Sequence, residues 1–158
     1  MAVKPIPDGY HSITPYMYVK GAGAAIEFYK KAFGATERMR MPMPDGRVGH
    51  AEIQIGDSCI MIADEFPDMG VKGPEAYGGS PMSLALYVED VDALFGQALA
   101  AGAKVVRPIK DQFYGDRSGT LTDPFGHTWT LATHKEDVTP EECHRRMEAA
   151  MKEHAGCG

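Results

Sequence analysis

An internal repeat is the feature that most constrains the fold of this chain. Residues 15–40 can be laid on residues 84–107, so that PYMYVKGAGAAIEFYKKAFGATERMR lies over LALYVEDVDALFGQALAAGAKVVR and Val19 opposite Val88, 69 positions later. In each segment an apolar strand leads into a helix, a glycine turn and a second strand. Identity is low, so the order of elements is what matches. A repeated supersecondary unit fixes the architecture, and the chain is expected to contain two copies of one module.

Helical periodicity is present in both copies, and a glycine suited to a helix C-cap follows each time, Gly34 or Gly102. The apolar positions are Ala22, Ala25, Ile26, Tyr29 and Phe33 in the first copy and Val91, Leu94, Phe95, Ala98 and Leu99 in the second. Strand-like segments at about 36–43, 47–55 and 58–64 follow the first helix, and the polar hairpin 42–65 corresponds to 108–137. Each module is therefore predicted to be βαβββ, which makes the fold α+β.

The expected organisation is a single domain over residues 1–137, followed by a C-terminal helix and tail at 138–158. Module one covers about 10–66, a Gly- and Pro-rich linker covers 66–81, and module two covers about 82–137. Thr139, Pro140 and Glu142 predict a capping box at the start of the last helix. Its apolar face is narrow, so we expect it to pack on the outside of the domain or on a partner subunit.

Composition and charge exclude several classes of function. The net charge is −6 and the pI about 5.5, whereas binding of a nucleic-acid backbone needs a basic face. No stretch approaches a membrane span, and the N-terminus lacks the apolar core of a signal peptide. Cys59, Cys143 and Cys157 are odd in number and widely spaced, which indicates a reduced, cytoplasmic chain with Cys59 as a core residue.

Several motifs make the sequence similar to a known superfamily. AIEFYKKAFGA in the first copy and DPFGHTWTL closing the second resemble the vicinal oxygen chelate superfamily, which includes glyoxalase I, bleomycin and fosfomycin resistance proteins and extradiol dioxygenases. GHAEIQIGDS, FYGDRSGTLTDPFGH and LYVEDVD look most like its PhnB-like branch, some members of which carry the label of a demethylubiquinone methyltransferase domain. The resemblance covers about residues 10–136 and implies the glyoxalase/bleomycin resistance/dihydroxybiphenyl dioxygenase fold, with a cupped mixed sheet.

The resemblance also implies where a metal would be held. In metal-using members each repeat supplies one ligand from its first strand and one from its last. By position these places are Thr14, Met61, Ser83 and Thr130, where the family pattern has His or Glu. Neutral hydroxyls and a thioether are poor ligands for a hard divalent ion. We therefore expect no metal at this site and no cofactor.

Other polar residues are candidates for chemistry. His50 and Glu52 alternate with apolar neighbours, which directs both side chains toward the cavity. There they could act together as a general base or serve as ligands of a relocated metal. The alternative is a solvated strand face with a local ion pair. Tyr16 and Tyr18 share the face of Thr14 and would stack on a flat ligand or simply form a cavity wall, whereas Trp129 should point to the helix-packed face.

The segment 111–119 offers a second candidate group. Gln112, Tyr114 and Arg117 combine an amide, a phenol and a guanidinium suited to a carboxylate or phosphonate. The structural alternative is an ordinary turn in which Arg117 pairs with Asp116.

Three hypotheses follow. The favoured one is a small-molecule binding protein of the glyoxalase/bleomycin resistance type without the usual metal site, which sequesters a toxic compound. The alternative is a lyase-, isomerase- or dioxygenase-like enzyme that uses His50 and Glu52, and the third is a pure assembly module. No nucleophile motif decides whether the chain is an enzyme. Many relatives build the cup from paired modules, and here both modules lie in one chain, so the resemblance allows a homodimer without requiring one.

Overall fold

The computed structural model describes the backbone of residues 3–155 and the side chains of residues 3–153, so Cys157 lies outside the described residues. Module one contains β1 (Tyr16–Val19), α1 (Ala22–Phe33), β2 (Thr36–Pro42), β3 (Val48–Ile55) and β4 (Ser58–Asp64). Two short 3₁₀ helices, Pro67–Met69 and Pro74–Tyr77, lie in the linker. Module two contains β5 (Ser83–Tyr87), α2 (Val91–Ala101), β6 (Lys104–Asp111), β7 (Asp116–Thr122) and β8 (Thr128–His134), and α3 (Pro140–Ala155) follows.

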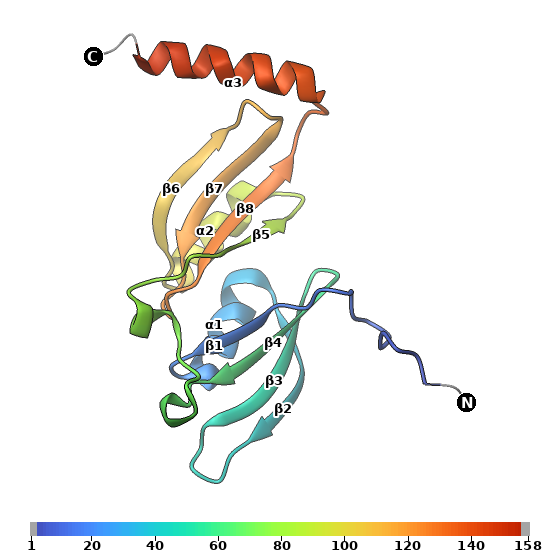
Figure 1. The fold of residues 1–158 in the computed structure, drawn as a ribbon, viewed down its shortest axis with the longest axis vertical. Coiled ribbons are helices and arrows are strands. Elements are labelled where there is room, and N and C mark those ends of the chain that lie inside the picture. Colours follow the sequence, from blue (N-terminus) through green and yellow to red (C-terminus); the bar gives the residue numbers. More distant parts are fainter. Residues whose placement is uncertain (1–2, 156–158) are drawn as a thin grey trace.

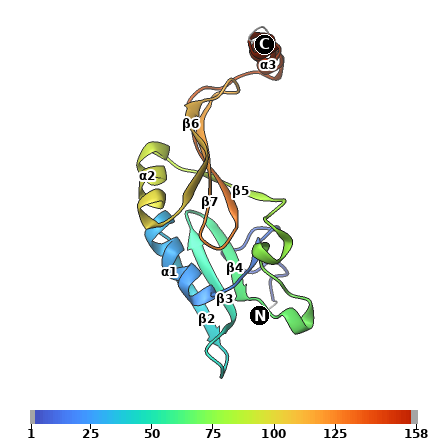
Figure 2. The same ribbon diagram turned by 90° about the vertical axis from the view of Figure 1, so that its left-hand side faces the viewer.

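Both modules form the same four-stranded mixed sheet, which confirms the predicted α+β repeat. The strand orders are β1-β4-β3-β2 and β5-β8-β7-β6, and in each sheet only the first pair is parallel. The repeat holds at the level of register, because Tyr16 pairs with Met61 and Ala85 pairs with Thr130. The two sheets follow one another along the long axis of the molecule (Figure 1). Figure 2 shows α1 and α2 stacked on one side of them.

The hydrophobic core lies between the sheets and these two helices. Trp129 is 2% exposed and points to the helix-packed side, as predicted. Its ring centroid lies 5.5 Å from that of Tyr29 and 4.6 Å from that of Phe33, both on α1. Cys59 is buried, also as predicted. One core is therefore shared by both modules, because a helix of module one packs on a strand of module two.

Asp123 explains the DPFG motif at the end of module two. This buried carboxylate accepts hydrogen bonds from the Tyr29 hydroxyl at 2.6 Å and from Trp129 Nε1 at 2.9 Å. It also accepts from the backbone N–H groups of Phe125 and His127, at 2.9 and 3.0 Å. The motif thus closes a turn and joins α1 to β8 at the same point.

The helix starts are capped from the last strand of each module. Asp64 at the end of β4 accepts from the N–H groups of Gly21 and Ala22, at 2.8 and 2.9 Å, and from the N–H of Val48 in β3 at 2.7 Å. Thr133 occupies the equivalent position in β8 and accepts from the first N–H of α2 at 2.9 Å. A side chain from a distant strand therefore satisfies donors that a helix leaves open.

The C-terminal helix begins as predicted, but its capping box is only half formed. Thr139 Oγ1 accepts from the Glu142 N–H at 3.2 Å, whereas the Glu142 carboxylate bonds Arg145 and Arg146 instead of returning to the cap. The nearby guanidinium groups outcompete a backbone N–H for this carboxylate. α3 lies beyond the end of module two (Figures 1 and 2), tied to it by Arg146 and Glu136 at 2.8 Å. In the described part of the chain, no helix is long and apolar enough to cross a membrane.

Candidate functional site

Each sheet has one face that its helix leaves uncovered, called here the open face. Because both helices lie on one side of the molecule, both open faces are turned away from them (Figure 2). Strand alternation places every second side chain there. On sheet one these include Tyr16, Tyr18, His50, Glu52 and Met61, and on sheet two Ser83, Tyr87, Ser118, Thr120 and Thr130.

The open face of sheet one carries a connected polar network. His50 Nδ1 lies 2.8 Å from the Tyr16 hydroxyl, and His50 Nε2 lies 3.4 Å from Glu52 Oε1. The Tyr10 hydroxyl donates to Glu52 Oε2 from the segment that precedes β1. The Tyr16 ring stacks on Tyr18 with centroids 5.0 Å apart. The structure thus brings together four predicted site residues, and it adds Tyr10.

The electrostatics of this network favour an ionised Glu52. The hydrogen bond from Tyr10 lowers the pKa of Glu52, with a smaller contribution from His50, while burial opposes them. The same hydrogen bond raises the pKa of Tyr10, and burial raises the pKa of Tyr16. Both nitrogens of His50 already have partners. The network is therefore a pre-formed set of donors and acceptors, and His50 must exchange a partner before it can take a proton from a substrate.

The four positions implied for a metal are arranged as two pairs, one in each module. Thr14 and Met61 line the same surface hollow, and Ser83 Oγ lies 3.1 Å from Thr130 Oγ1. All four side chains are uncharged, so they are poor ligands for a hard divalent ion. Across residues 3–153, no group of three or more His, Cys, Asp or Glu side chains could hold a metal ion.

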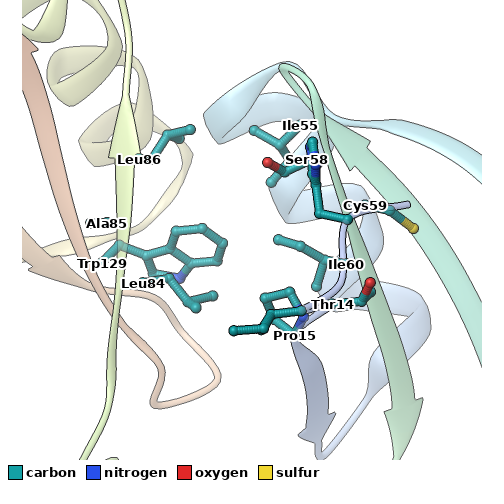
Figure 3. A pocket seen from close by; sticks show the side chains of 12 residues that line it. Thr14, Pro15, Ile55, Ser58, Cys59, Ile60, Leu84, Ala85, Leu86 and Trp129 are labelled. Carbon is teal, nitrogen blue, oxygen red and sulfur yellow. The ribbon is translucent and has the colours of Figure 1, made fainter. Parts of the chain in front are cut away.

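A small apolar pocket separates the two modules. Leu84, Leu86 and Trp129 from module two face Ile60 and Pro15 from module one (Figure 3). Its volume is about 220 Å³. Ligand sites usually occupy about 300–1,000 Å³. This pocket suits an apolar fragment or a single ring rather than a whole drug-sized molecule.

A larger cleft of about 600 Å³ lies on the open face of sheet two. The predicted residues Gln112, Tyr114 and Thr130 line it, together with Arg107 and Lys110, which no sequence motif indicated. The cleft lies between β6, β7, β8 and the turn that joins β6 to β7.

Arg117 is not part of this cleft. Its guanidinium donates to Asp92 at 2.7 and 2.8 Å and to Asp111 at 3.2 Å. The structural alternative, a pairing of Arg117 with Asp116, is wrong, because successive strand residues face opposite sides of the sheet. Asp116 instead accepts from the Tyr87 hydroxyl at 2.6 Å and contacts His134 Nδ1 at 2.8 Å.

Comparison with known proteins supports the resemblance seen in the sequence. The family model described as the Glyoxalase/Bleomycin resistance protein/Dioxygenase superfamily matches residues 9–131. The uncharacterized protein Rv0887c of Mycobacterium tuberculosis is 43% identical over 143 residues, which cover 89% of this chain and 82% of that protein.

Two solved structures extend the comparison. TioX from Micromonospora sp. ML1 is 25% identical with a TM-score of 0.64, covering 78% of this chain and 98% of that one. A PhnB protein from Bacillus cereus, described as a putative 3-demethylubiquinone-9 3-methyltransferase, shares the fold with a TM-score of 0.60 at 22% identity. It covers 78% of this chain and 99% of that one.

Proposed function

Because the chain belongs to the glyoxalase/bleomycin resistance/dioxygenase superfamily, we propose that it binds a small organic molecule on its open faces without a metal at the usual site. Binding of this kind would sequester a toxic compound, as in the resistance members that give the family part of its name. The main support is the combination of uncharged side chains at Thr14, Met61, Ser83 and Thr130 with a cleft of about 600 Å³ that one of them, Thr130, lines.

The chemistry of the two faces supports a ligand that is partly aromatic and partly polar. The stacked pair Tyr16 and Tyr18 offers a flat apolar surface beside the His50–Glu52 pair. On sheet two, Thr130 Oγ1 lies within 3.2 Å of Thr120 Oγ1, and such hydroxyls can turn to donate or accept. A mostly pre-formed cavity with a few oriented polar groups is typical of a small-molecule site.

A homodimer belongs to the same proposal. Tyr16 is 42% and Tyr87 is 61% exposed, and Met41 on the edge strand of sheet one is 55% exposed. Large apolar side chains gathered on open sheet faces are typical of surfaces that another protein covers. A second copy, set with its module two over module one of the first, would close both faces. Light scattering after size exclusion is expected to give twice the chain mass of 17.2 kDa, and a monomer at all concentrations would contradict the dimer.

A thermal-shift screen of small molecules against chelator-treated protein tests the binding function. Ligand present at about 100 times its Kd stabilises the folded state by about 2.7 kcal/mol, which is a readily measured rise in Tm. We expect hits whose effect is the same in metal-free protein and after loading with Ni, Zn, Mn or Fe. Hits that appear only in loaded protein, or no hits at all, would refute metal-independent binding.

A second candidate function is a lyase-, isomerase- or dioxygenase-like enzyme. It is favoured by one observation, the approach of His50 Nε2 to Glu52 Oε1 with the Tyr16 hydroxyl on the other ring nitrogen. Either the pair acts as a base, or it holds a displaced ion. Elemental analysis distinguishes the metal form, because stoichiometric metal that is lost in His50→Ala but kept in Tyr16→Phe would establish it. If the protein takes up no metal under any loading condition, only the general-base role of His50 and Glu52 is left for this candidate function.

A further inference from the structure

The cleft on the open face of sheet two contains two cations that the rest of the described chain does not neutralise. No carboxylate among residues 3–153 forms an ion pair with Arg107 or Lys110, although the chain carries a net charge of −6. Arg117 on the neighbouring strand shows the contrast, because two carboxylates bind its guanidinium. Unpaired cations beside a concave surface are available to an anionic ligand.

The backbone of β6 is irregular in a way that places both cations in the cleft. Arg107 pairs with Thr120 and Lys110 pairs with Ser118, so three steps along β6 match two steps along β7. In a regular strand, residues three apart point to opposite faces. The extra residue lies at the segment containing Pro108, which has no N–H to lose from the ladder. Bulges of this kind re-aim side chains and are frequent beside binding sites.

Uncharged hydrogen-bonding side chains lie beside the two cations in the same cleft. The Tyr114 hydroxyl lies 3.4 Å from Ser118 Oγ, and Thr120 Oγ1 lies 3.2 Å from Thr130 Oγ1. Gln112 donates to the Ser118 carbonyl at 3.4 Å from the turn after β6. One surface therefore presents two cationic side chains and several hydroxyl groups, and an oxyanion can accept hydrogen bonds from all of them.

The equivalent surface of module one differs. Met39 pairs with Glu52 and Met41 pairs with His50, so two thioethers occupy the places that correspond to the two cations of β6. β2 runs regularly between these methionines, and the extra residue that lies between Arg107 and Lys110 is present only in β6. The cationic cleft is therefore a property of the second copy and not of the repeated fold.

We propose that this cleft binds the anionic head group, a phosphate or a carboxylate, of a small organic molecule. The inference rests on the proposed binding function and specifies the class of ligand. Arg107 and Lys110 supply the charge, while Ser118, Thr120 and Tyr114 complete the set of donors. The aromatic or apolar part of the ligand extends along the open face.

NMR titration of amide signals with three matched probes tests the proposal. Phenyl phosphate and benzoate carry the two head groups, and benzyl alcohol is the neutral control. The test variants are Arg107→Met, Lys110→Met and the double variant, which copy the methionines of module one. Lys104→Met is the control, because it removes a charge from the start of the same strand outside the cleft.

Both anionic probes, or one of them, are expected to shift amides of β6 and β7 near the cleft. Each substitution in the cleft should weaken binding about tenfold or more, since a hydrogen bond to a charged group contributes about 1.5–3 kcal/mol. Lys104→Met should bind like the parent, and all variants should keep dispersed spectra. The tighter anion identifies the head group. Added salt should weaken the binding of the anionic probes and leave the binding of benzyl alcohol unchanged.

The outcomes separate this inference from the function on which it rests. Binding of anions by the double variant as tightly as by the parent overturns the cleft assignment. Binding of the neutral probe alone overturns the anionic head group and leaves the small-molecule function standing. If neither these probes nor the small-molecule screen gives any binding, both proposals fail.

Discussion

The contact between Tyr29 and Asp123 gives a sharp test of how the modules are joined. The Tyr29 side chain is fully buried on α1, and its hydroxyl donates at 2.6 Å to a carboxylate 94 residues later in the chain. Burial, followed by the charge of Asp123, raises the pKa of Tyr29 well above its usual value, so the phenol remains a donor throughout the accessible pH range. Tyr29→Phe removes one hydrogen bond and keeps the ring, with its tilted contact to Trp129.

The expected cost of Tyr29→Phe is about 1.5–3 kcal/mol, the usual range for a hydrogen bond to a charged group. Asp123→Asn should cost more, because the new amide presents N–H groups toward a site where Trp129 Nε1 also donates. In the Asp123→Asn background the same Tyr29→Phe change should cost less, since the pair is coupled. Tyr77→Phe is the matched control, because Tyr77 is 68% exposed.

Urea unfolding followed by the fluorescence of Trp129, the single tryptophan, measures these differences. The midpoint should fall while the slope with urea stays constant. A loss below about 0.5 kcal/mol for Tyr29→Phe lies within the range of ordinary surface substitutions and would refute the proposed role. Equal losses in both backgrounds would show that the hydroxyl acts through something other than Asp123.

Three further predictions follow from the structure. Asp64→Ala should lower the free energy of unfolding in urea by about 2–4 kcal/mol, because it leaves three backbone donors without their acceptor, whereas Asp64→Asn should lose less. The hydrogen bond from Tyr10 is the main cause of the lowered pKa of Glu52. Ionised Glu52 therefore stabilises the fold fully above the ordinary glutamate pKa, and this contribution is lost as the pH falls through the lowered pKa. Tyr10→Phe should flatten the dependence of Tm on pH in that acidic window. Gly115→Ala should destabilise strongly in a Tm measurement, because φ is +101° and a Cβ would lie 2.1 Å from a carbonyl oxygen, whereas Gly96→Ala in α2 has open space and should raise Tm.

Much of the fold was predictable, because the repeat and the strand alternation depend on local patterns. The offset between Val19 and Val88 aligned both modules, and the alternation around His50 and Glu52 correctly placed both on one face. Trp129 was assigned to the helix-packed side by the same reasoning.

The rest of the site depends on features that have no local signal. Tyr10 reaches Glu52 across 42 residues of sequence, so nothing near either residue indicates the contact. Arg107 and Lys110 share a face only because of a bulge, and simple counting places them on opposite sides. The composition of segment 111–119 predicts that Arg117 binds the ligand together with Gln112 and Tyr114. Its position on the strand instead directs its side chain to carboxylates on the other face of the sheet.

The divergence of the two open faces bears on what kind of ligand the pair of modules can hold. Equivalent positions carry Glu52 and Thr120 in the two copies, with Met39 beside the first and Arg107 beside the second. A duplicated scaffold begins with identical faces, and a symmetric cup would suit a symmetric ligand or an ion bound equally by both halves. Here one face supplies an acid, an imidazole and thioethers, and the other supplies cations and hydroxyls. A ligand that satisfies both faces would itself be polarised, with an anionic end for the cations of sheet two and an aromatic end that donates a hydrogen bond to Glu52 on sheet one. This asymmetry fits the proposed organic acid better than a bare metal ion.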